Sequence, residues 1–483
     1  MMAMTCPYTS HIPTPGAGSR VLVVGLGTSG YWSARHMAHL GSNVTVSEAR
    51  PEAELDADQL DELQALGVIL ETGGHREETF IHTDVIVVSP GVPLDMIPLR
   101  AARSRHIPMM GELELASRFI HEPIIAVTGT NGKSTVTSLM GHMLENAGFR
   151  VFVGGNIGTP LMAYAAQGDR AHYLVVEVSS FQLDTVASFH PVVSILLNIS
   201  PDHLDRYPDY EAYIASKLRI FINQGEGDYL ILNDADPVLS SLSPSSGVST
   251  LRYGLRQKAR RNAFVRNGTL TAGLKNRHEE RFLIHNFVLP GSHNLENLLG
   301  ATLAAEALGI GPDIIQKSMD TFRGLPHRLE YVGNIHGISF YNDSKATNVD
   351  AAVRAIRSFE RPLILIAGGR HKGADYAPLV TAALGRVKGA VFLGEATELL
   401  ARSFAQKIPF WVAGEMEEAV LKAFSMASKG DAVLLAPACA SFDMFSDYAH
   451  RGNVFKTCIH GLMASSSASG ENVRPESGVV NGG

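Results

Sequence analysis

The sequence predicts an α/β fold of three domains with mainly parallel sheets. Its 483 residues exceed what a single hydrophobic core usually holds, since domains average roughly 100 to 200 residues. Short, fully apolar runs recur along the chain and are separated by longer segments with helical periodicity. Such runs are typical of strands that are buried on both faces of a parallel sheet and joined by crossover helices. The expected strands lie at residues 21–24, 44–46, 85–88, 124–127, 173–178, 193–198, 229–232, 363–367, 390–393 and 432–435.

Two interruptions divide these elements into domains. A helical pattern over residues 112–119 ends where a glycine-rich segment begins. Pro326 ends a second helical stretch, and an expected hairpin follows, with strands at 330–335 and 338–342 joined by a two-residue turn. The tail is rich in Ser, Gly and Asn and is predicted to be disordered. The expected segments are domains at residues 1–120, 121–325 and 326–464, and a tail at 465–483.

The charge pattern argues against a nucleic-acid-binding protein. Acidic residues outnumber basic ones by 48 to 41, which gives a net charge of −7, whereas nucleic-acid binders usually show a large basic footprint. The one basic cluster, Lys258, Arg260 and Arg261, is expected in a solvated loop. An apolar content of 45% and a charged content of 18% also exclude an intrinsically disordered chain. We therefore expect small-molecule partners and no nucleic acid.

Cysteine usage indicates a reducing compartment. Cys6, Cys439 and Cys458 are few, and they lack CxxC spacing, so no disulfide framework is expected. The first 19 residues lack the basic and apolar regions of a signal peptide. No apolar run approaches the ~18 residues that a membrane helix needs. We expect a cytoplasmic protein without membrane insertion.

The first glycine-rich segment predicts a Rossmann-like N-terminal domain. Gly25, Gly27 and Gly30 form a GxGxxG pattern between a strand and a helix, and Glu48 follows the next strand. In this dinucleotide fingerprint the glycines permit a tight turn close to a phosphate, and the acid meets a ribose hydroxyl. The pattern fits a nicotinamide or flavin cofactor, another nucleotide diphosphate, or plain loop geometry. No residues suited to hydride transfer follow it, which weakens the redox interpretation.

The second glycine-rich segment predicts a central P-loop-type ATPase domain. Backbone N–H groups of such a loop can cradle phosphates, while Lys133 can reach the β- and γ-phosphates and Ser134 or Thr135 can hold Mg²⁺. Two residues separate its glycines where the general P-loop has four, so this is a shortened variant. The alternative is a Gly-rich turn before a helix. The segment consists of Gly129, Thr130, Asn131, Gly132, Lys133, Ser134 and Thr135.

Three further residues lie just after strands or on an apolar helix face. Glu177, at the end of the strand at 173–178, could cap a helix or bind a metal. His203, just past another strand, could be a hydrogen-bonded loop residue or a ligand. Lys217 lies on the apolar side of a helix expected over 210–223. It could extend its ammonium to water, or be a desolvated amine with a lowered pKa that can be modified or act at a metal centre.

Together these residues resemble the Mur ligase family, whose members form amide bonds with ATP. The resemblance runs from residue 20 to residue 462 and includes the shortened P-loop. Ser-Phe-Gln-Leu at 180–183, Asp-Arg-Tyr-Pro at 205–208 and Asn-Asp-Ser-Lys-Ala-Thr-Asn at 342–348 resemble the member that adds D-glutamate. Further matching segments lie at 154–158, 216–219, 324–328 and 437–441.

The resemblance implies a ligase of peptidoglycan precursor synthesis. ATP would phosphorylate the carboxylate of UDP-N-acetylmuramoyl-L-alanine, and the amine of D-glutamate would attack the acyl phosphate. The implied fold adds a Rossmann-like C-terminal domain to the two domains above. The implied cofactors are ATP and Mg²⁺ at two sites, where Mn²⁺ could substitute. The implied partners are these small molecules, and we expect a monomer.

The resemblance also implies roles for individual residues. Lys133 contacts the transferred phosphoryl group. Ser134 and Glu177 hold one Mg²⁺, and His203 helps to hold a second. Lys217 is expected to be carbamylated by CO₂, which turns an amine into a carboxylate-like metal partner. The implied contacts are Asn294, Asn297, Arg328 and Asp343, with the P-loop, for ATP; Thr28, Ser29, Glu48, Arg50, Ser89, Gly91, Asn156 and Ser179 for the UDP-linked substrate; and Lys345, Thr347, Lys372, Ser441 and Tyr448 for D-glutamate.

The sequence departs from the family pattern at several positions. Glu48 stands where the family has Asp, and Tyr448 where it has Phe. Arg370 and His371 replace an acid and a small residue before Lys372. These departures concern fine specificity and not the reaction class. The alternatives are another Mur-type or a folylpolyglutamate-type amino-acid ligase and, more remotely, a dinucleotide-dependent oxidoreductase.

Overall fold

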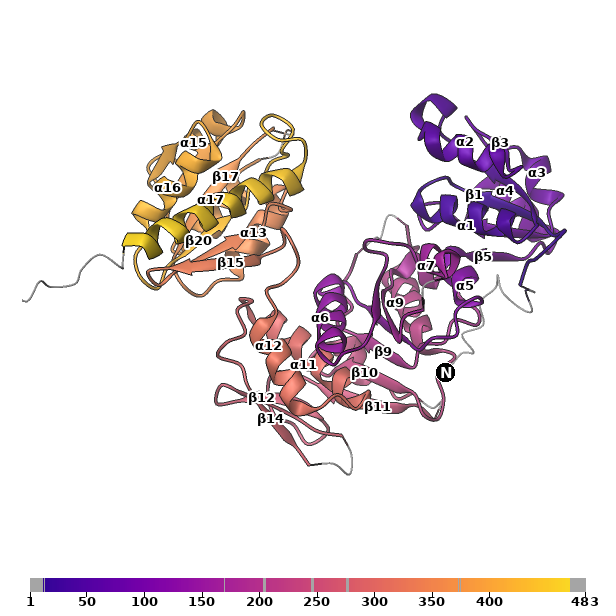
Figure 1. Ribbon diagram of the computed structural model, residues 1–483, viewed down its shortest axis with the longest axis horizontal. Coiled ribbons are helices and arrows are strands. Elements are labelled where there is room, and N and C mark those ends of the chain that lie inside the picture. The colour runs from indigo at the N-terminus through magenta and orange to yellow at the C-terminus, as the bar shows by residue number, and fades with distance from the viewer. Residues whose placement is uncertain are drawn as a thin grey trace, which may run out of the picture. The chain divides into compact units, whose positions relative to one another are not determined.

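The computed structural model describes residues 12, 14–168, 170–202, 206–244, 247–274, 278–371, 373 and 375–469 (Figure 1). The chain forms two compact units. The first comprises Met1–His285 and Leu295–Asp320, and the second comprises Asn286–Asn294 and Thr321–Gly483. Two sheets lie in the first unit and one in the second, and most of their strands pair in parallel, which confirms the predicted α/β class.

The first sheet has five parallel strands in the order β3-β2-β1-β4-β5. Alternate side chains of β1 enter different cores: Val23 packs in one with Met37 of α1, and Leu22 packs in another with Phe80 of α3. Because both faces are covered, the strand is apolar almost throughout. The elements are β1 (Arg20–Val24), α1 (Thr28–His39), β2 (Asn43–Ser47), α2 (Ala57–Ala65), β3 (Ile69–Glu71), α3 (Glu77–Ile81), β4 (Val85–Val88), α4 (Ile97–Ser104) and β5 (Met109–Gly111), with a 3₁₀ turn at Glu52–Glu54.

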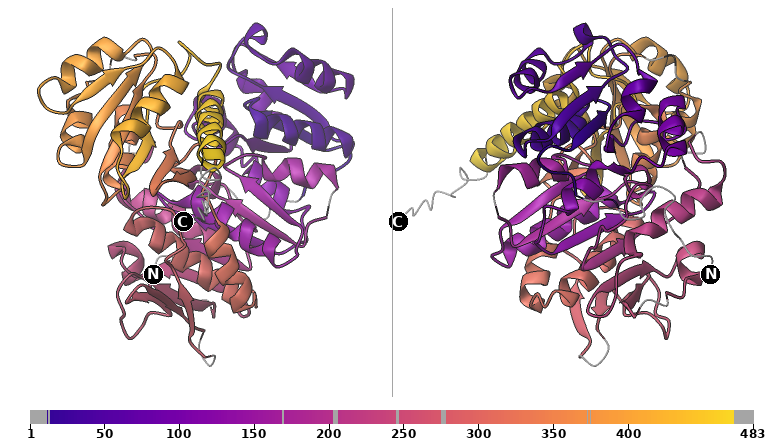
Figure 2. Two further views of the ribbon diagram at one scale, coloured as in Figure 1. Left: turned by 60° about the vertical axis from the view of Figure 1, so that its left-hand side comes forward. Right: turned by 90° about the vertical axis from the view of Figure 1, so that its right-hand side faces the viewer.

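The second sheet has nine strands in the order β14-β13-β12-β11-β10-β9-β6-β8-β7. Strand β6 lies between β8 and β9, so the loops after these three parallel strands meet at one edge, where α/β sheets bind ligands. Strands β12 to β14 form an antiparallel ribbon, and β14 is the edge strand at the opposite end of the strand order from β7 (Figure 2). The strands are β6 (Ile124–Thr128), β7 (Val151–Gly155), β8 (Tyr173–Glu177), β9 (Val193–Leu196), β10 (Tyr229–Asn233), β11 (Ser249–Tyr253), β12 (Ala263–Arg266), β13 (Thr269–Ala272) and β14 (Glu280–Leu283). The helices are α5 (Glu112–Ser117), α6 (Lys133–Asn146), α7 (Leu161–Gln167), α8 (Ser180–Leu183), α9 (Tyr210–Leu218), α10 (Pro237–Ser241), α11 (Ser292–Ala307) and α12 (Pro312–Thr321).

The third sheet has six strands in the order β15-β16-β20-β17-β18-β19. Leu365 of β17 faces a core with Leu379 of α14, whereas Ile366 faces a second core with Phe455 of α17. Helices therefore cover both faces, as the apolar strand runs predicted. The elements are β15 (Glu330–Ile335), β16 (Ile338–Asn342), α13 (Val349–Arg357), β17 (Leu363–Gly368), α14 (Ala377–Ala383), β18 (Val387–Leu393), α15 (Thr397–Phe404), β19 (Phe410–Val412), α16 (Met416–Met426), β20 (Ala432–Leu435) and α17 (Tyr448–Ser469).

Most predicted strands are confirmed to within a few residues, and the hairpin of β15 and β16 has the predicted bounds. Its turn residues His336 and Gly337 have φ of 51° and 83°, as a tight hairpin turn requires. The domain boundaries at 120, 325 and 464 stay predictions. Helix α17 continues to Ser469, so residues 465–469, which we expected in the tail, are helical; the rest of the tail lies outside the described residues. In the described part of the chain, no helix has the length and apolar character needed to span a membrane.

Two local predictions are wrong. The helix expected over 210–223 ends at Leu218, and a 3₁₀ turn follows it. In that turn the guanidinium of Arg219 is buried and donates to the carbonyl oxygens of Leu183 and Val186. The basic cluster is also not fully solvated, because the Arg261 side chain is 4% exposed and donates to Asp234 at 2.9 Å. The buried carboxylate of Asp234 draws the cluster inward, a pairing that no local pattern shows.

A buried carboxylate, Glu114 of α5, connects the segment after the first sheet to the loop after α8. Its side chain is fully buried and accepts the backbone N–H groups of Ala187, Ser188 and Phe189 at 2.8 to 3.1 Å. Arg118 donates to the same carboxylate at 2.7 Å. A buried charge with this many donors is well satisfied, and losing the acceptor would leave several donors unpaired.

We expect Glu114→Ala to lower the free energy of unfolding by about 3 kcal/mol, because it removes the acceptor from a buried guanidinium and from three N–H groups. Urea denaturation followed by circular dichroism measures this change. The control is Arg170→Ala, which breaks an ion pair in which the arginine is 60% exposed, and its effect on stability should be much smaller than that of Glu114→Ala. Similar effects of the two substitutions would show that Glu114 does not connect these segments.

Candidate active site

The shortened P-loop is fixed by contacts on two sides. Gly129 and Gly132 have φ of 155° and 87°, which glycine adopts more readily than other residues. A Cβ on Gly132 would lie 2.4 Å from Asn297 Oδ1, so α11 packs directly on the loop. Asn198 Oδ1 accepts from the Asn131 N–H at 2.8 Å, and Asn198 Nδ2 donates to the Asn131 carbonyl at 3.0 Å. The loop thus presents the start of α6, where backbone N–H groups suit a phosphate.

Two lysines converge on the carbonyl oxygen of Gly129. Lys133 Nζ donates to it at 2.9 Å and to the Thr130 carbonyl at 3.0 Å. Lys217 Nζ, from α9, donates to the same Gly129 oxygen at 2.9 Å and lies 4.8 Å from the ring centroid of Tyr213. The sequence predicted both residues as site residues, and the structure brings them together.

Lys217 is a desolvated amine, the second of the two predicted alternatives. It is 2% exposed. Burial lowers its pKa from the usual 10.5 to about 7, the charge of Lys133 acts in the same direction, and Asp202, Asp184 and Glu177 oppose the shift. A lysine with this pKa is largely neutral at mildly alkaline pH, so its nitrogen can act as a nucleophile.

Glu177 ends β8 beside the P-loop strand and offers an oxygen to a cation. Its Oε1 accepts from Asn156 Nδ2 at 2.8 Å, and its Oε2 is buried without a hydrogen-bond partner among the described residues. A buried carboxylate oxygen in this state suits Mg²⁺, and Ser134 is the second residue of α6, which follows the P-loop. His203 lies outside the described residues. Within the described ranges, no three His, Cys, Asp or Glu side chains gather into a metal cluster.

The glycine-rich loop after β1 is closed by Glu48. A Cβ on Gly30 would lie 1.9 Å from the Gly25 carbonyl oxygen, so the turn needs glycine there. Glu48 accepts from the Leu26 N–H at 2.6 Å and from Arg50 N and Nε at 2.9 and 3.1 Å. Burial opposes ionisation, but these hydrogen bonds hold the pKa of Glu48 at about 2. Glu48 and Arg50, both predicted to contact the UDP-linked substrate, thus contact each other and the loop, and their contact with a substrate stays a prediction.

Arg206 fixes the second loop of the predicted UDP site. Its guanidinium donates to the carbonyl oxygens of Gly91 at 3.0 Å and Val92 at 2.5 Å and lies 4.5 Å from the ring centroid of Phe181. The sequence singled out Arg206 only as a member of a family motif. The loop also contacts the glycine-rich loop through Ser89, whose Oγ donates to a backbone carbonyl there at 2.9 Å.

The remaining predicted contacts for the UDP-linked substrate lie on short helices. Thr28 and Ser29 begin α1, whose N-cap Gly27 makes no side-chain capping bond. Ser179 caps α8 in a reciprocal capping box with Gln182. The Ser179 hydroxyl is therefore engaged within its own helix turn, and its contact with a substrate stays a prediction.

Asn294 and Asp343 were predicted for ATP binding and are both buried. Asn294 Nδ2 donates to the Pro290 carbonyl at 2.7 Å. Asp343 Oδ1 accepts from the Leu329 N–H at 3.1 Å. Burial raises the pKa of Asp343 to about 7, although the Leu329 N–H and the charge of Arg328 lower it. Arg328 and Asp343 are thus electrostatic neighbours, as expected for residues of one site.

The residues predicted for D-glutamate lie in the second unit, after the carboxyl ends of its strands. Lys345 Nζ lies 5.3 Å from the ring centroid of Tyr448, and the Thr347 N–H donates to the Lys345 carbonyl at 2.8 Å. Ser441 is 2% exposed and follows β20. Lys372 lies outside the described residues. The structure therefore brings Lys345 and Tyr448 together and places Ser441 on a neighbouring loop.

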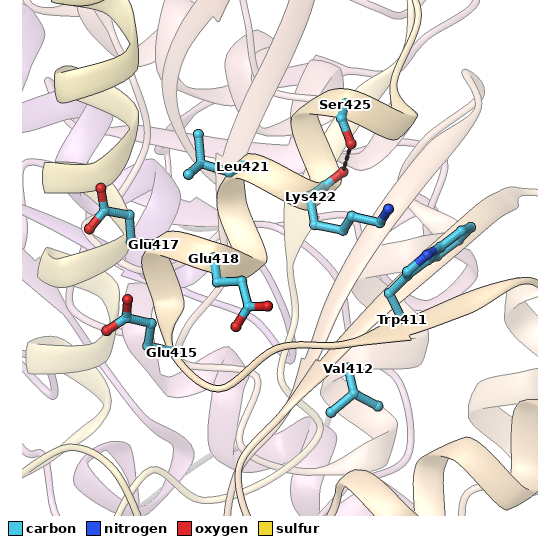
Figure 3. A pocket seen from close by; sticks show the side chains of 8 residues that line it. All are labelled: Trp411, Val412, Glu415, Glu417, Glu418, Leu421, Lys422 and Ser425. Atoms are coloured by element: carbon cyan, nitrogen blue, oxygen red, sulfur yellow. Dashed lines mark hydrogen bonds between the residues drawn. The ribbon is translucent and has the colours of Figure 1, made fainter.

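A surface groove on the second unit contains none of these residues (Figure 3). Its side chains come from β19 and α16. Lys422 extends toward Trp411 and lies 4.6 Å from its ring centroid. The groove is open and its residues belong to an edge strand and a covering helix, so we place no substrate there. Its lining is Trp411, Val412, Glu415, Glu417, Glu418, Leu421, Lys422 and Ser425.

Three family models match the chain in sequence order. A Mur ligase MurD-like N-terminal domain matches residues 19–111, a Mur ligase middle domain matches 127–305, and a Mur ligase glutamate ligase domain matches 327–439. The middle-domain match contains the P-loop, Glu177 and Lys217, and the last match contains Arg328 and Lys345. The matched segments correspond to the three sheets of the α/β fold.

Individual proteins are similar to the chain over nearly its full length. A UDP-N-acetylmuramoylalanine–D-glutamate ligase from Desulfosudis oleivorans is 44% identical over 463 residues, which cover 95% of this chain and 100% of that protein. UDP-N-acetylmuramate-alanine ligase MurC from Thermotoga maritima has a similar structure, with a TM-score of 0.51, 17% identity and coverage of 92% and 100%. MurF ligase from the same organism, in complex with ADP, has a TM-score of 0.52, 16% identity and coverage of 87% and 96%. At these identities the two structures establish a shared fold.

We expect the stability difference between the wild type and Lys217→Met to rise in favour of the wild type as the pH increases from about 7 to about 10 in CO₂-free buffer. The folded-state pKa of about 7 lies below the usual 10.5, so the unfolded chain binds one more proton in this range and stability increases with pH. The slope should approach at most about 1.4 kcal/mol per pH unit. Denaturant unfolding at several pH values measures it. Lys258→Met removes an exposed lysine as a control, and a flat difference for Lys217→Met would contradict the lowered pKa.

Proposed function

The chain belongs to the Mur ligase family, and we infer from this membership that it is the ATP-dependent ligase that adds D-glutamate to UDP-N-acetylmuramoyl-L-alanine. The observation that carries this conclusion is the agreement over nearly the whole chain with ligases of that name. The product is a peptide-like amide of peptidoglycan precursor synthesis. We place the enzyme in the cytoplasm, where its nucleotide-linked substrate and ATP are available. We propose that it acts as a monomer.

The reaction must make a carboxylate react with an amine. A carboxylate is a poor electrophile, and transfer of the γ-phosphoryl group of ATP converts it into an acyl phosphate. The amine of D-glutamate then attacks the carbonyl carbon, a C–N bond forms, and the C–O bond to phosphate breaks as the amine gives up a proton. All three substrates are anions, so the protein has to supply positive charge and position the reacting atoms.

The P-loop supplies this charge to the phosphates. Lys133 is held by two carbonyl oxygens of its own loop, next to the backbone N–H groups that begin α6. Its ammonium can turn from these neutral acceptors to a phosphate oxygen and follow the transferred group. Asn297 packs on the same loop from α11, which supports a contact with ATP. Asn294, Arg328 and Asp343 complete the proposed ATP contacts.

Glu177 and Ser134 would hold a Mg²⁺ beside the phosphates, with His203 at a second one. A bound Mg²⁺ supplies neutralisation of phosphate charge and polarisation of the transferred group. The buried Oε2 of Glu177, which has no hydrogen-bond partner among the residues that the structure describes, supports this assignment. In the proposed carbamate, the neutral nitrogen of Lys217 forms a bond to the carbon of CO₂ and loses a proton, which leaves an anion. The lowered pKa makes the neutral amine available for that step.

The proposed sites for the two other substrates use residues nearer the two ends of the chain. The UDP part is bound by the start of α1, with Thr28 and Ser29, and by the loop with Ser89 and Gly91. Glu48, Arg50, Asn156 and Ser179 complete this set. D-Glutamate is bound by Lys345, Thr347, Ser441, Tyr448 and Lys372. Two lysines suit a dicarboxylate, because each carboxylate can receive a charged donor.

We expect phosphate release from ATP when UDP-N-acetylmuramoyl-L-alanine and D-glutamate are both present, and background release when either is omitted. The acyl phosphate needs the amine to react onward, so turnover depends on both substrates. A coupled phosphate assay with a panel of D- and L-amino acids measures this dependence. L-Glutamate serves as the control with identical charge and composition. Turnover with L-glutamate but not with D-glutamate would point instead to a folylpolyglutamate-type ligase.

We expect Lys217→Ala to reduce kcat on the order of 100-fold and added formate or acetate to restore part of it. A short carboxylate can occupy the space of the missing carbamate and supply its negative charge. The matched control is Lys133→Ala, which also removes a lysine beside Gly129 but should gain nothing from added carboxylate. Absence of rescue, together with an unmodified lysine in a mass measurement of the wild type, would rule out the carbamate.

A further inference from the structure

A fully buried arginine, Arg451 of α17, joins three loops of the second unit. It is 1% exposed. Its Nε donates to Ser344 Oγ at 3.0 Å and its Nη2 to the Ser344 carbonyl at 2.9 Å. Both Nη atoms donate to the Cys439 carbonyl at 3.2 Å, and Nη1 also donates to the carbonyls of Ala440 at 3.2 Å and Gly368 at 3.4 Å. One guanidinium thus contacts the chain just after β16 and β20 and at the end of β17.

Two of these loops carry residues assigned above to D-glutamate. Lys345 directly follows Ser344, and Ser441 directly follows Ala440. Ser344 Oγ, which accepts from the arginine, donates to the carbonyl of Tyr448 at 2.7 Å. The ring of Tyr448 in turn lies near the Lys345 ammonium. The residues that accept from the arginine are therefore one covalent step or one hydrogen bond from the proposed substrate contacts.

The loops approach each other so closely at Gly369 that there is no room for a side chain between them. Gly369 has φ of 128°, and a Cβ there would lie 2.2 Å from the Ala440 carbonyl oxygen and 3.1 Å from Arg451 Nη1. The guanidinium fills the remaining space with donors in a fixed plane, which set distances and angles at once. The hydrogen bonds of such a buried charge can therefore specify one arrangement of the loops.

We propose that Arg451 is a positioning residue for the D-glutamate site: it holds the loops after β16 and β20 in one arrangement and so sets the spacing between Lys345 and Ser441. The inference rests on the proposed function, because it takes these residues to bind D-glutamate. Arg451 itself is enclosed by backbone carbonyls and acts through the loops.

The test is Arg451→Lys, which keeps the positive charge but replaces a planar five-donor group with one that cannot reach all three loops. Phosphate release is measured with each of the three substrates varied in turn. The KM for D-glutamate should rise about 10- to 100-fold, while the KM for ATP and for the UDP-linked substrate should stay within about twofold. A smaller increase of the same kind is expected for Ser344→Ala, which removes one acceptor and serves if Arg451→Lys does not fold.

The matched control is Ile459→Ala. Ile459 lies in the same helix and is fully buried in the core, and its apolar side chain cannot donate a hydrogen bond to the loops, so its truncation disturbs α17 without removing the guanidinium. Its KM for D-glutamate should stay within about twofold of the wild type. Equal increases in all three KM values, or a loss of kcat alone, would overturn the positioning role. A wild type that does not turn over D-glutamate would instead overturn the proposed function, and the inference with it.

Discussion

The hydrogen bonds of two lysines to one carbonyl oxygen, that of Gly129, are the constraint on which the central site depends. Two ammonium groups that share one neutral acceptor repel each other, and the buried one is the one that gives up its proton more readily. Lys133, on the P-loop, is the cation that we propose to contact phosphate. Lys217 becomes an amine with nucleophilic character, as the proposed carbamate requires.

This pairing is possible because parallel strands end together. Strand β6 delivers Gly129, and β8 beside it delivers Glu177; helix α9, which follows β9 in the chain, delivers Lys217. The loop itself is held by Asn198 after β9 and by Asn297 on α11. Three segments distant in sequence therefore contact this loop, and the glycines supply the backbone angles that its conformation needs.

The sequence predicted the parts of this arrangement that follow from local rules. Apolar runs gave the strands, and glycine spacing with Lys133 gave the P-loop, because both depend on residues close in sequence. Arg261 shows where such reasoning fails, since its burial depends on Asp234 across the sheet. Arg206 and Arg451 fail for the same reason: each binds carbonyl oxygens of distant loops, and a carbonyl is present at every residue. Lys217 stayed ambiguous until its burial was known.

The partners of Arg50 and Lys133 determine how readily each cation can turn to a ligand. Arg50 is neutralised by Glu48, and that ion pair closes the glycine-rich loop after β1. A ligand that took Arg50 would have to break this pair and leave the Glu48 carboxylate buried. Lys133 donates to carbonyl oxygens, which carry no net charge, so these contacts orient its ammonium without neutralising it. A phosphate is a stronger acceptor than a carbonyl and can replace them at little electrostatic cost. A chain with a net charge of −7 can thus attract anionic substrates locally, where side chains such as Lys133 donate to backbone carbonyl oxygens.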